Sequence, residues 1–152
     1  MRPILDIVTT ISVGLLIGTE FAVAVFINPI LRKLGPREEL QAIRLFAAKL
    51  GAAMPFWYSG SLILLIAEAV VGYHQPGENL LIAACVIWVA VIVLTVLFLV
   101  PINNRLVRVD LNAPPETALA EHGKWDLLHR WRVVSLTGAM VCFLVAATQL
   151  AQ

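Results

Sequence analysis

Four long runs of apolar residues, separated by shorter polar segments, set the pattern of the chain. They cover residues 4–31, 52–73, 80–101 and 133–150. A helix needs about 20 residues to cross about 30 Å of hydrocarbon, and backbone polar groups in lipid must find partners within the same segment. The pattern therefore predicts four transmembrane helices. We expect an all-α, integral membrane four-helix bundle, with residues 1–152 forming a single transmembrane domain.

Composition supports a membrane protein. The chain has 152 residues, of which 60% are hydrophobic and only 14% charged, whereas a soluble domain is about a quarter charged. This length leaves room for one domain and for no separate soluble module. The formal net charge is +1, so nothing indicates a nucleic-acid partner. The lipid bilayer is the expected partner, and assembly into a homo-oligomer stays open.

The basic residues predict how the bundle is oriented. All but Arg2 fall into two blocks, one after the first apolar run and one before the fourth: Arg32, Lys33, Arg37, Arg44 and Lys49, then Arg105, Arg108, Lys124, Arg130 and Arg132. Because loops rich in lysine and arginine remain in the cytoplasm, we expect both long loops there and both termini outside. In a bacterial inner membrane, which is the expected location, both termini would be periplasmic.

Two further helical segments are expected beside the spans. In the first loop, Arg37–Leu50 carries its apolar residues on one face, which predicts a separate amphipathic helix lying at the membrane interface. Pro55 then starts or kinks the second span. In the last loop, Pro114 and Pro115 break the chain, and a helix restarts at Glu116. We expect this helix to run unbroken into the fourth span as an extended cytoplasmic lead-in.

The lead-in carries the most distinctive set of side chains. His122, Trp125, His129 and Arg132 follow one another at spacings of three, four and three, which places them on one face of a helix. A neutral imidazole can bind haem iron or a transition metal, or act as a general base near neutral pH. A guanidinium can hold a carboxylate or a phenolate. The alternative is that these side chains only anchor the helix at the interface.

Two acidic residues lie inside predicted spans. Glu20 falls near the middle of the first span, where an ionisable group costs about 2.5–3.5 kcal/mol to insert and usually faces a partner or a cavity. We expect it at the floor of a cytoplasmic pocket that also gathers Asn28 and Asn103. Glu68 falls toward the outer end of the second span, where it can reach the outer interface, so a structural role is favoured for it. No metal motif is complete. The metal is therefore unidentified, and the candidate ligands are His129, His122 and Glu20.

Three motifs taken together resemble one family. They combine Gly14, Gly18 and Glu20 with Asn28-Pro29, then Pro101, Asn103 and Leu106, then Trp125, His129 and Arg132. Over essentially the whole chain, the pattern is similar to the small four-helix membrane proteins that include the fungal anthrone oxygenases. The resemblance implies an oxygenase or oxidoreductase that acts on a small apolar aromatic substrate of the anthrone type. It assigns the functional positions to Asn103, Trp125, His129 and Arg132.

Two mechanisms stay open at this stage. Without a cofactor, His129 would accept a proton, Arg132 and Asn103 would stabilise the resulting oxyanion, and dioxygen would react with the carbanion. Alternatively His129 and Glu20, with His122 as a further ligand, would hold haem or a transition metal that activates oxygen. The competing functions are a transporter of protons or a small solute, and an accessory membrane subunit without catalytic activity.

Overall fold

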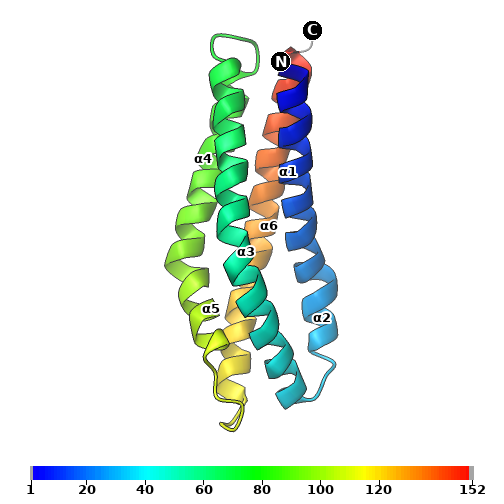
Figure 1. Ribbon diagram of the computed structural model, residues 1–152, viewed down its shortest axis with the longest axis vertical. Coiled ribbons are helices and arrows are strands. Elements are labelled where there is room, and N and C mark those ends of the chain that lie inside the picture. The colour runs from blue at the N-terminus through cyan, green and yellow to red at the C-terminus, as the bar shows by residue number, and fades with distance from the viewer. Residues whose placement is uncertain (1, 151–152) are drawn as a thin grey trace.

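The computed structural model describes residues 2–150 and confirms an all-helical bundle of four long stretches (Figure 1). Each stretch is long and apolar enough to cross a membrane, and the four run from Arg2–Leu31, Pro36–Val71, Glu78–Val107 and Glu116–Leu150. The described ends of the first and last stretches lie together at one end of the bundle, while the connections after the first and third stretches lie at the other (Figure 1).

Two of the four stretches contain a π-helical turn. The first consists of α1 (Arg2–Ala22), the π-helix η1 (Val23–Ile27) and α2 (Asn28–Leu31), and the third of α4 (Glu78–Leu94), the π-helix η2 (Thr95–Leu99) and α5 (Val100–Val107). The second and fourth stretches are the single helices α3 (Pro36–Val71) and α6 (Glu116–Leu150). Three predicted spans lie inside these stretches, and the second ends two residues early, at Val71.

The two π-helices occupy equivalent places in their stretches. Each begins six residues before a proline, Pro29 or Pro101. Proline has no N–H group and so cannot donate the next α-helical hydrogen bond. In a π turn, each N–H bonds to the carbonyl five residues earlier instead of four. Thus the N–H of Asn28 bonds to the carbonyl of Val23, and the N–H of Val100 bonds to that of Thr95. The first and third stretches therefore share one local design.

The expected interfacial helix does not exist as a separate element. Residues 37–50 form the beginning of α3, which continues without a break through Pro55. The amphipathic pattern was correctly read, but its apolar face packs on the bundle rather than on lipid. Leu40 and Ile43 are both buried, and Ile43 joins a small core cluster with Leu31 of α2. That prediction was wrong because the sequence could not show which surface the face would meet.

The expected unbroken fourth helix is confirmed, since α6 runs from Glu116 to Leu150 without interruption. Its 35 residues span roughly 52 Å at 1.5 Å per residue, well beyond the roughly 30 Å of a hydrocarbon core. The part of α6 that holds His122, Trp125 and His129 lies in its first half, which packs against α5 and η1.

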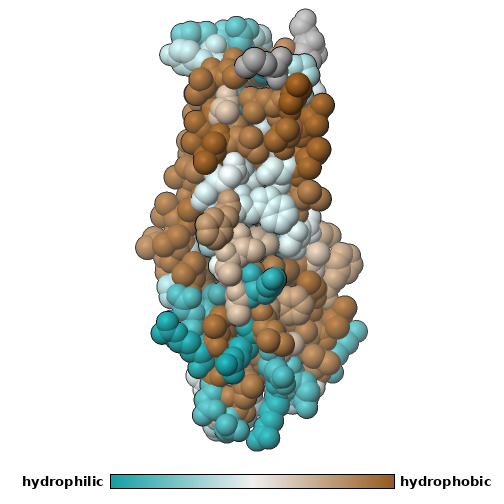
Figure 2. Space-filling view, in the orientation of Figure 1, coloured by the Kyte–Doolittle hydropathy of each residue, from teal (hydrophilic) through white to brown (hydrophobic). Residues whose placement is uncertain are grey.

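Large buried side chains from all four stretches form the main core. It includes Leu16, Leu65, Trp88, Leu136 and Phe143, and the indole N–H of Trp88 donates to the carbonyl of Tyr58 at 3.1 Å. Hydrophobic side chains also cover most of the outer surface. Figure 2 shows that hydrophilic side chains gather at the two ends of the bundle, mainly at the end with the long connections. This is the distribution that a lipid-embedded bundle requires.

Candidate functional site

A buried cluster of charged side chains joins α1 to α6. Glu20 of α1 is 3% exposed, and His129 of α6 is 1% exposed. A guanidinium nitrogen of Arg132 donates to one carboxylate oxygen of Glu20 at 2.5 Å, and Nδ1 of His129 lies 3.1 Å from the same oxygen. The other ring nitrogen of His129, Nε2, lies 3.0 Å from the backbone carbonyl oxygen of Glu20.

These contacts engage both ring nitrogens of His129. Nε2 faces a carbonyl oxygen, which can only accept, so Nε2 carries a hydrogen. Nδ1 lies 2.9 Å from a guanidinium nitrogen of Arg132 as well as close to the Glu20 carboxylate. The carboxylate of Glu20 and the guanidinium of Arg132 offset one another's charge beside this imidazole. A buried group of charges that sums to zero is far cheaper than a lone charge, and so Glu20 is balanced where it lies.

The guanidinium of Arg132 also lies against two aromatic rings. Its central carbon is 5.6 Å from the centroid of Tyr58 and 5.8 Å from that of Trp125, within the range of cation–π attraction. Trp125 in turn stacks on the ring of His129, with centroids 4.7 Å apart and planes at 15°. The cluster therefore fixes the position of the Trp125 indole from one side.

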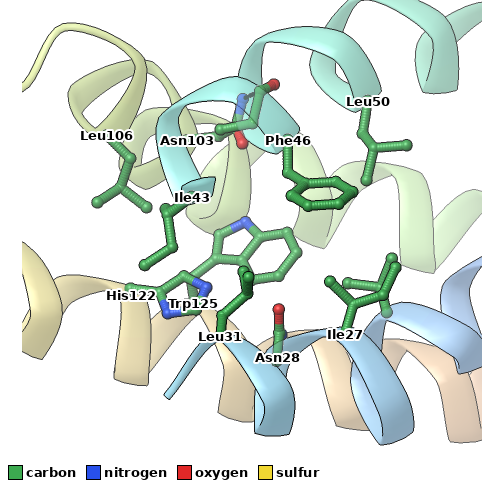
Figure 3. Close-up of a pocket in the computed structure, with 12 residues that line it drawn as sticks. Ile27, Asn28, Leu31, Ile43, Phe46, Leu50, Asn103, Leu106, His122 and Trp125 are labelled. Carbon is green, nitrogen blue, oxygen red and sulfur yellow. Dashed lines mark hydrogen bonds between the residues drawn. The ribbon is translucent and has the colours of Figure 1, made fainter. Parts of the chain in front are cut away.

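The opposite side of Trp125 belongs to a small, mostly apolar cavity (Figure 3). The cavity has a volume of about 40 Å³. Its lining comes from the loop end of all four stretches: Val23, Ile27, Asn28, Leu31, Ile43, Phe46, Ala47, Leu50, Asn103, Leu106, His122 and Trp125. Both η1 and the residues that follow it contribute, so the π turn shapes one wall. We call this space the Trp125 pocket.

The polar groups of the Trp125 pocket come from four side chains: Asn28, Asn103, His122 and Trp125. The amide nitrogen of Asn103 donates to the carbonyl of Ala47 at 3.2 Å, which leaves the amide oxygen as its remaining acceptor. This approach depends on Gly51, because a methyl group there would lie 2.7 Å from the same nitrogen. The amide nitrogen of Asn28 donates to the carboxylate of Asp126. Figure 3 shows the amide oxygen of Asn28 directed into the pocket.

Asp126 is an important residue that the sequence reading did not identify. It is buried and accepts hydrogen bonds from Asn28 at 2.6 Å, Arg32 at 2.6 Å and Arg130 at 3.2 Å. These bonds tie the end of the first stretch to α6 and hold Asn28 in the pocket wall. Asp126 falls on the same helix face as His122 and His129, four and three residues away. That spacing is the signal by which the sequence could have identified Asp126.

The structure divides the predicted site residues into two groups. Glu20, His129 and Arg132 form the charged cluster. Asn103 and His122 line the Trp125 pocket, and Trp125 lies between the cluster and the pocket. The expectation that Glu20 forms the pocket floor is wrong, because the cluster encloses its carboxylate and it does not line the cavity. Asn103 and Arg132 bind different partners, and the structure does not bring them to one point.

The donor atoms of the cluster do not suit a metal or haem iron. Both ring nitrogens of His129 are engaged by the protein, and the guanidinium of Arg132 occupies the carboxylate of Glu20. A cation bound there would lie against a fixed positive charge. Across residues 2–150, no group of three or more His, Cys, Asp or Glu side chains is placed to hold a metal ion. We therefore derive no step from a metal at this cluster.

The geometry describes a helical membrane bundle with a small pocket beside a neutralised charge cluster. A family model described as Anthrone oxygenase matches residues 44–142 of the chain. Since this is more than half of its length, the chain belongs to the anthrone oxygenase family, as the motifs had predicted. The matched range includes Asn103 and the four residues of the α6 face but begins after Glu20 and Asn28. No curated protein and no solved structure gives a significant match.

Proposed function

We propose that this protein is a membrane-embedded oxygenase that converts a small apolar aromatic substrate of the anthrone type to the corresponding quinone in the Trp125 pocket. Family membership supports the reaction class. The observation that carries the location is the pocket itself, which combines apolar walls with a few converging polar groups, as small-molecule sites do. The basic residues at this end of the bundle favour a pocket that faces the cytoplasmic leaflet.

The polar groups of the Trp125 pocket fit a planar substrate that carries a carbonyl and phenolic hydroxyl groups. The amide oxygens of Asn28 and Asn103 are acceptors for hydroxyl groups. The indole N–H of Trp125 is a donor, and within residues 2–150 it makes no hydrogen bond. Such a donor stabilises the oxyanion that develops when the substrate loses a proton. The flat indole also offers a surface on which an aromatic substrate can stack.

A substrate of three fused rings must widen this pocket before it binds. The cavity of about 40 Å³ is large enough for a water molecule but smaller than the roughly 150 Å³ of a cavity that admits benzene. Phe46 and Leu50 of α3 line it opposite η1 and α2 (Figure 3). Phe46 is also exposed on the outer surface. Displacing these two side chains would open the pocket sideways, toward the lipid in which an apolar substrate dissolves.

The proposed reaction needs dioxygen and no other reactant. The methylene carbon of the substrate gives up one proton, and its electron pair remains on the conjugated ring system as an oxyanion. Dioxygen accepts these electrons and forms a carbon–oxygen bond, and protonation of the outer oxygen gives a hydroperoxide. Loss of the second carbon-bound hydrogen with the outer oxygen releases water and leaves a ketone. The sum is one methylene and one dioxygen giving one carbonyl and one water.

In this scheme the charged cluster positions Trp125 rather than touching the substrate. His129 stacks on the indole, and Arg132 contacts its face. Glu20 fixes both of these residues through the ion pair and the carbonyl contact. The sequence suggested His129 as the proton acceptor. To act in that way, His129 would first have to break a contact that one of its ring nitrogens makes with the protein. Its position instead suits a support for the pocket wall.

The test is anthrone-dependent oxygen uptake by the protein purified in mild detergent, with quinone formation followed by absorbance. The rate is compared with detergent alone, because anthrones also oxidise slowly without protein. We expect Trp125→Ala to lower kcat/KM by about 100-fold, since it removes both the donor and the stacking surface. The matched control is Trp131→Ala, whose side chain is 66% exposed on the same helix.

The two variants separate the proposal from general damage to the bundle. Full activity in Trp131→Ala together with loss in Trp125→Ala supports catalysis in the pocket. No turnover above the detergent rate by the unmodified protein, across several anthrones that differ in hydroxylation, would contradict the proposed function. Equal activity of the two variants would place the reaction elsewhere in the molecule.

A further inference from the structure

His122 is the only imidazole that lines the Trp125 pocket. It lies on α6, is 5% exposed, and forms part of the cavity wall beside Leu106 and Ile43 (Figure 3). One face of its ring lies parallel to the indole of Trp125, with centroids 6.0 Å apart and planes at 12°. Among residues 2–150, neither ring nitrogen makes a hydrogen bond to the protein. The side chain is therefore held by packing, and its nitrogens remain available.

His129 differs on each of these points. Both of its ring nitrogens are occupied, and the ring does not line the cavity. The indole of Trp125 stands between the two histidines and stacks on both. A ligand in the pocket would thus meet His122 directly, while Trp125 would screen it from His129. Of the two imidazoles on the α6 face, only His122 has a free lone pair for a ligand.

The charges around His122 leave that lone pair unengaged. Asp126, one turn further along α6, is the acid that acts on it, and the other charged or titratable groups that do so are Arg32 and His129. Asp126 binds Arg32, Arg130 and the amide of Asn28, so its oxygens already have partners. No ion pair in the described part of the chain includes His122. Burial keeps this imidazole neutral, and its free ring nitrogen can accept a proton.

We propose that His122 is the base that removes the acidic carbon-bound proton of the substrate. This inference rests on the proposed function and refines it. The carbon–hydrogen bond breaks, the proton goes to the free ring nitrogen of His122, and the electron pair passes to the substrate oxyanion that the Trp125 N–H stabilises. After dioxygen has added, the imidazolium returns the proton to the outer oxygen and gives the hydroperoxide. His122 is neutral again before water is lost.

The test uses the full chain in mild detergent and compares His122→Ala with His122→Gln. We expect either change to lower kcat by about 100-fold or more, the usual contribution of general base catalysis. Binding of a non-oxidisable anthraquinone and the midpoint of thermal unfolding should stay close to those of the unmodified protein. Added imidazole should restore part of the rate in His122→Ala, where the removed ring leaves space, and none in His122→Gln. The control is His74→Ala, in the connection at the opposite end.

The outcomes distinguish this inference from the function on which it rests. An unmodified protein without anthrone turnover would overturn both. An active protein whose His122→Ala variant keeps its kcat would overturn the role of His122 and leave the proposed function intact. The same holds if the variant loses quinone binding along with activity and does not respond to imidazole, because His122 would then serve only to bind. Recovery by imidazole of a His129→Ala variant instead would assign the base to His129.

Discussion

The bundle buries two glutamates in opposite halves and treats them differently. Glu20 meets a guanidinium and an imidazole from α6. Glu68 of α3 is 1% exposed and accepts a single hydrogen bond, from the hydroxyl of Thr9 at 2.9 Å. Its other carboxyl oxygen has no hydrogen-bond partner within the described residues. One acid is thus built into an ion pair, whereas the other is satisfied by one neutral hydroxyl.

The surroundings of Glu20 stabilise a charged carboxylate, whereas the surroundings of Glu68 only accommodate an acid. An isolated carboxylate in an apolar setting is so costly that the neutral acid is favoured. Of the charged groups that act on Glu68, the Asp6 carboxyl favours the neutral form and the Arg2 guanidinium opposes it. In the Glu20 cluster, by contrast, an arginine and a histidine hold a carboxylate in place. That arrangement also supports Trp125, which forms the pocket wall. The comparison predicts that equivalent changes at the two sites will have unequal effects.

The largest effect should come from removing the cation beside Glu20. We expect Arg132→Met to lower the free energy of unfolding by about 3 kcal/mol, because a buried carboxylate loses its charge partner. The measurement is unfolding by SDS titration in mixed micelles. The control is Arg105→Met, since Arg105 forms an exposed pair with Glu121 and such pairs contribute less than about 1 kcal/mol. Equal losses would show that the Glu20 pair behaves like a surface contact.

A double change should cost less than the sum of its two single changes. With Glu20→Gln added to Arg132→Met, no unpaired charge remains in the cluster. We expect a coupling energy of about 2 kcal/mol between the two sites, measured as a double-mutant cycle by the same titration. Strict additivity of the two single changes would mean that the carboxylate and the guanidinium do not stabilise one another.

A smaller effect is expected at the third buried acid, Asp126. We predict that Asp126→Asn lowers the free energy of unfolding by about 1.5 kcal/mol. The side chains of Arg32 and Arg130 that it binds are half exposed, and water screens such pairs. Asp110→Asn is the control, because the Asp110 carboxylate accepts a local backbone bond in an exposed loop. A loss as large as that of Arg132→Met would rank Asp126 with Glu20.

The smallest effect should be seen at Glu68. Glu68→Gln keeps an acceptor for the Thr9 hydroxyl and replaces a neutral acid with a neutral amide of the same shape. We expect a change of about 0.5 kcal/mol or less, near the average of about 0.6 kcal/mol for one interhelical hydrogen bond in a membrane. Glu20→Gln, measured beside it, should cost several times more. A loss above about 2 kcal/mol at Glu68 would indicate a charged group and remove the contrast.

The sequence allowed the scaffold of the site to be predicted because that scaffold depends on local spacing. The three-four-three spacing of His122, Trp125, His129 and Arg132 correctly placed them on one face of a continuous helix. The structure adds that this face turns into the bundle, which packing decides and periodicity cannot show. The same limit explains why residues 37–50 were wrongly assigned to the membrane interface.

The pairings within the site could not be predicted from one chain. Glu20 and Arg132 lie more than a hundred positions apart, and nothing local joins them. Asp126 shares the helix face of the predicted residues, yet its importance comes from Asn28 and Arg32 in another stretch. Which histidine faces the pocket and which faces the cluster depends on the rotation of α6 about its axis.

The π-helices carry a consequence for how related chains should be compared. A π turn contains one residue more than the α turn that it replaces, so it is equivalent to a single-residue insertion within a helix. Each residue advances the direction of the side chains by about 100°. A relative whose first helix is regular needs a one-residue gap between Val23 and Ile27 when the two chains are aligned. Without that gap, the residue placed opposite Asn28 would come from another face of the helix.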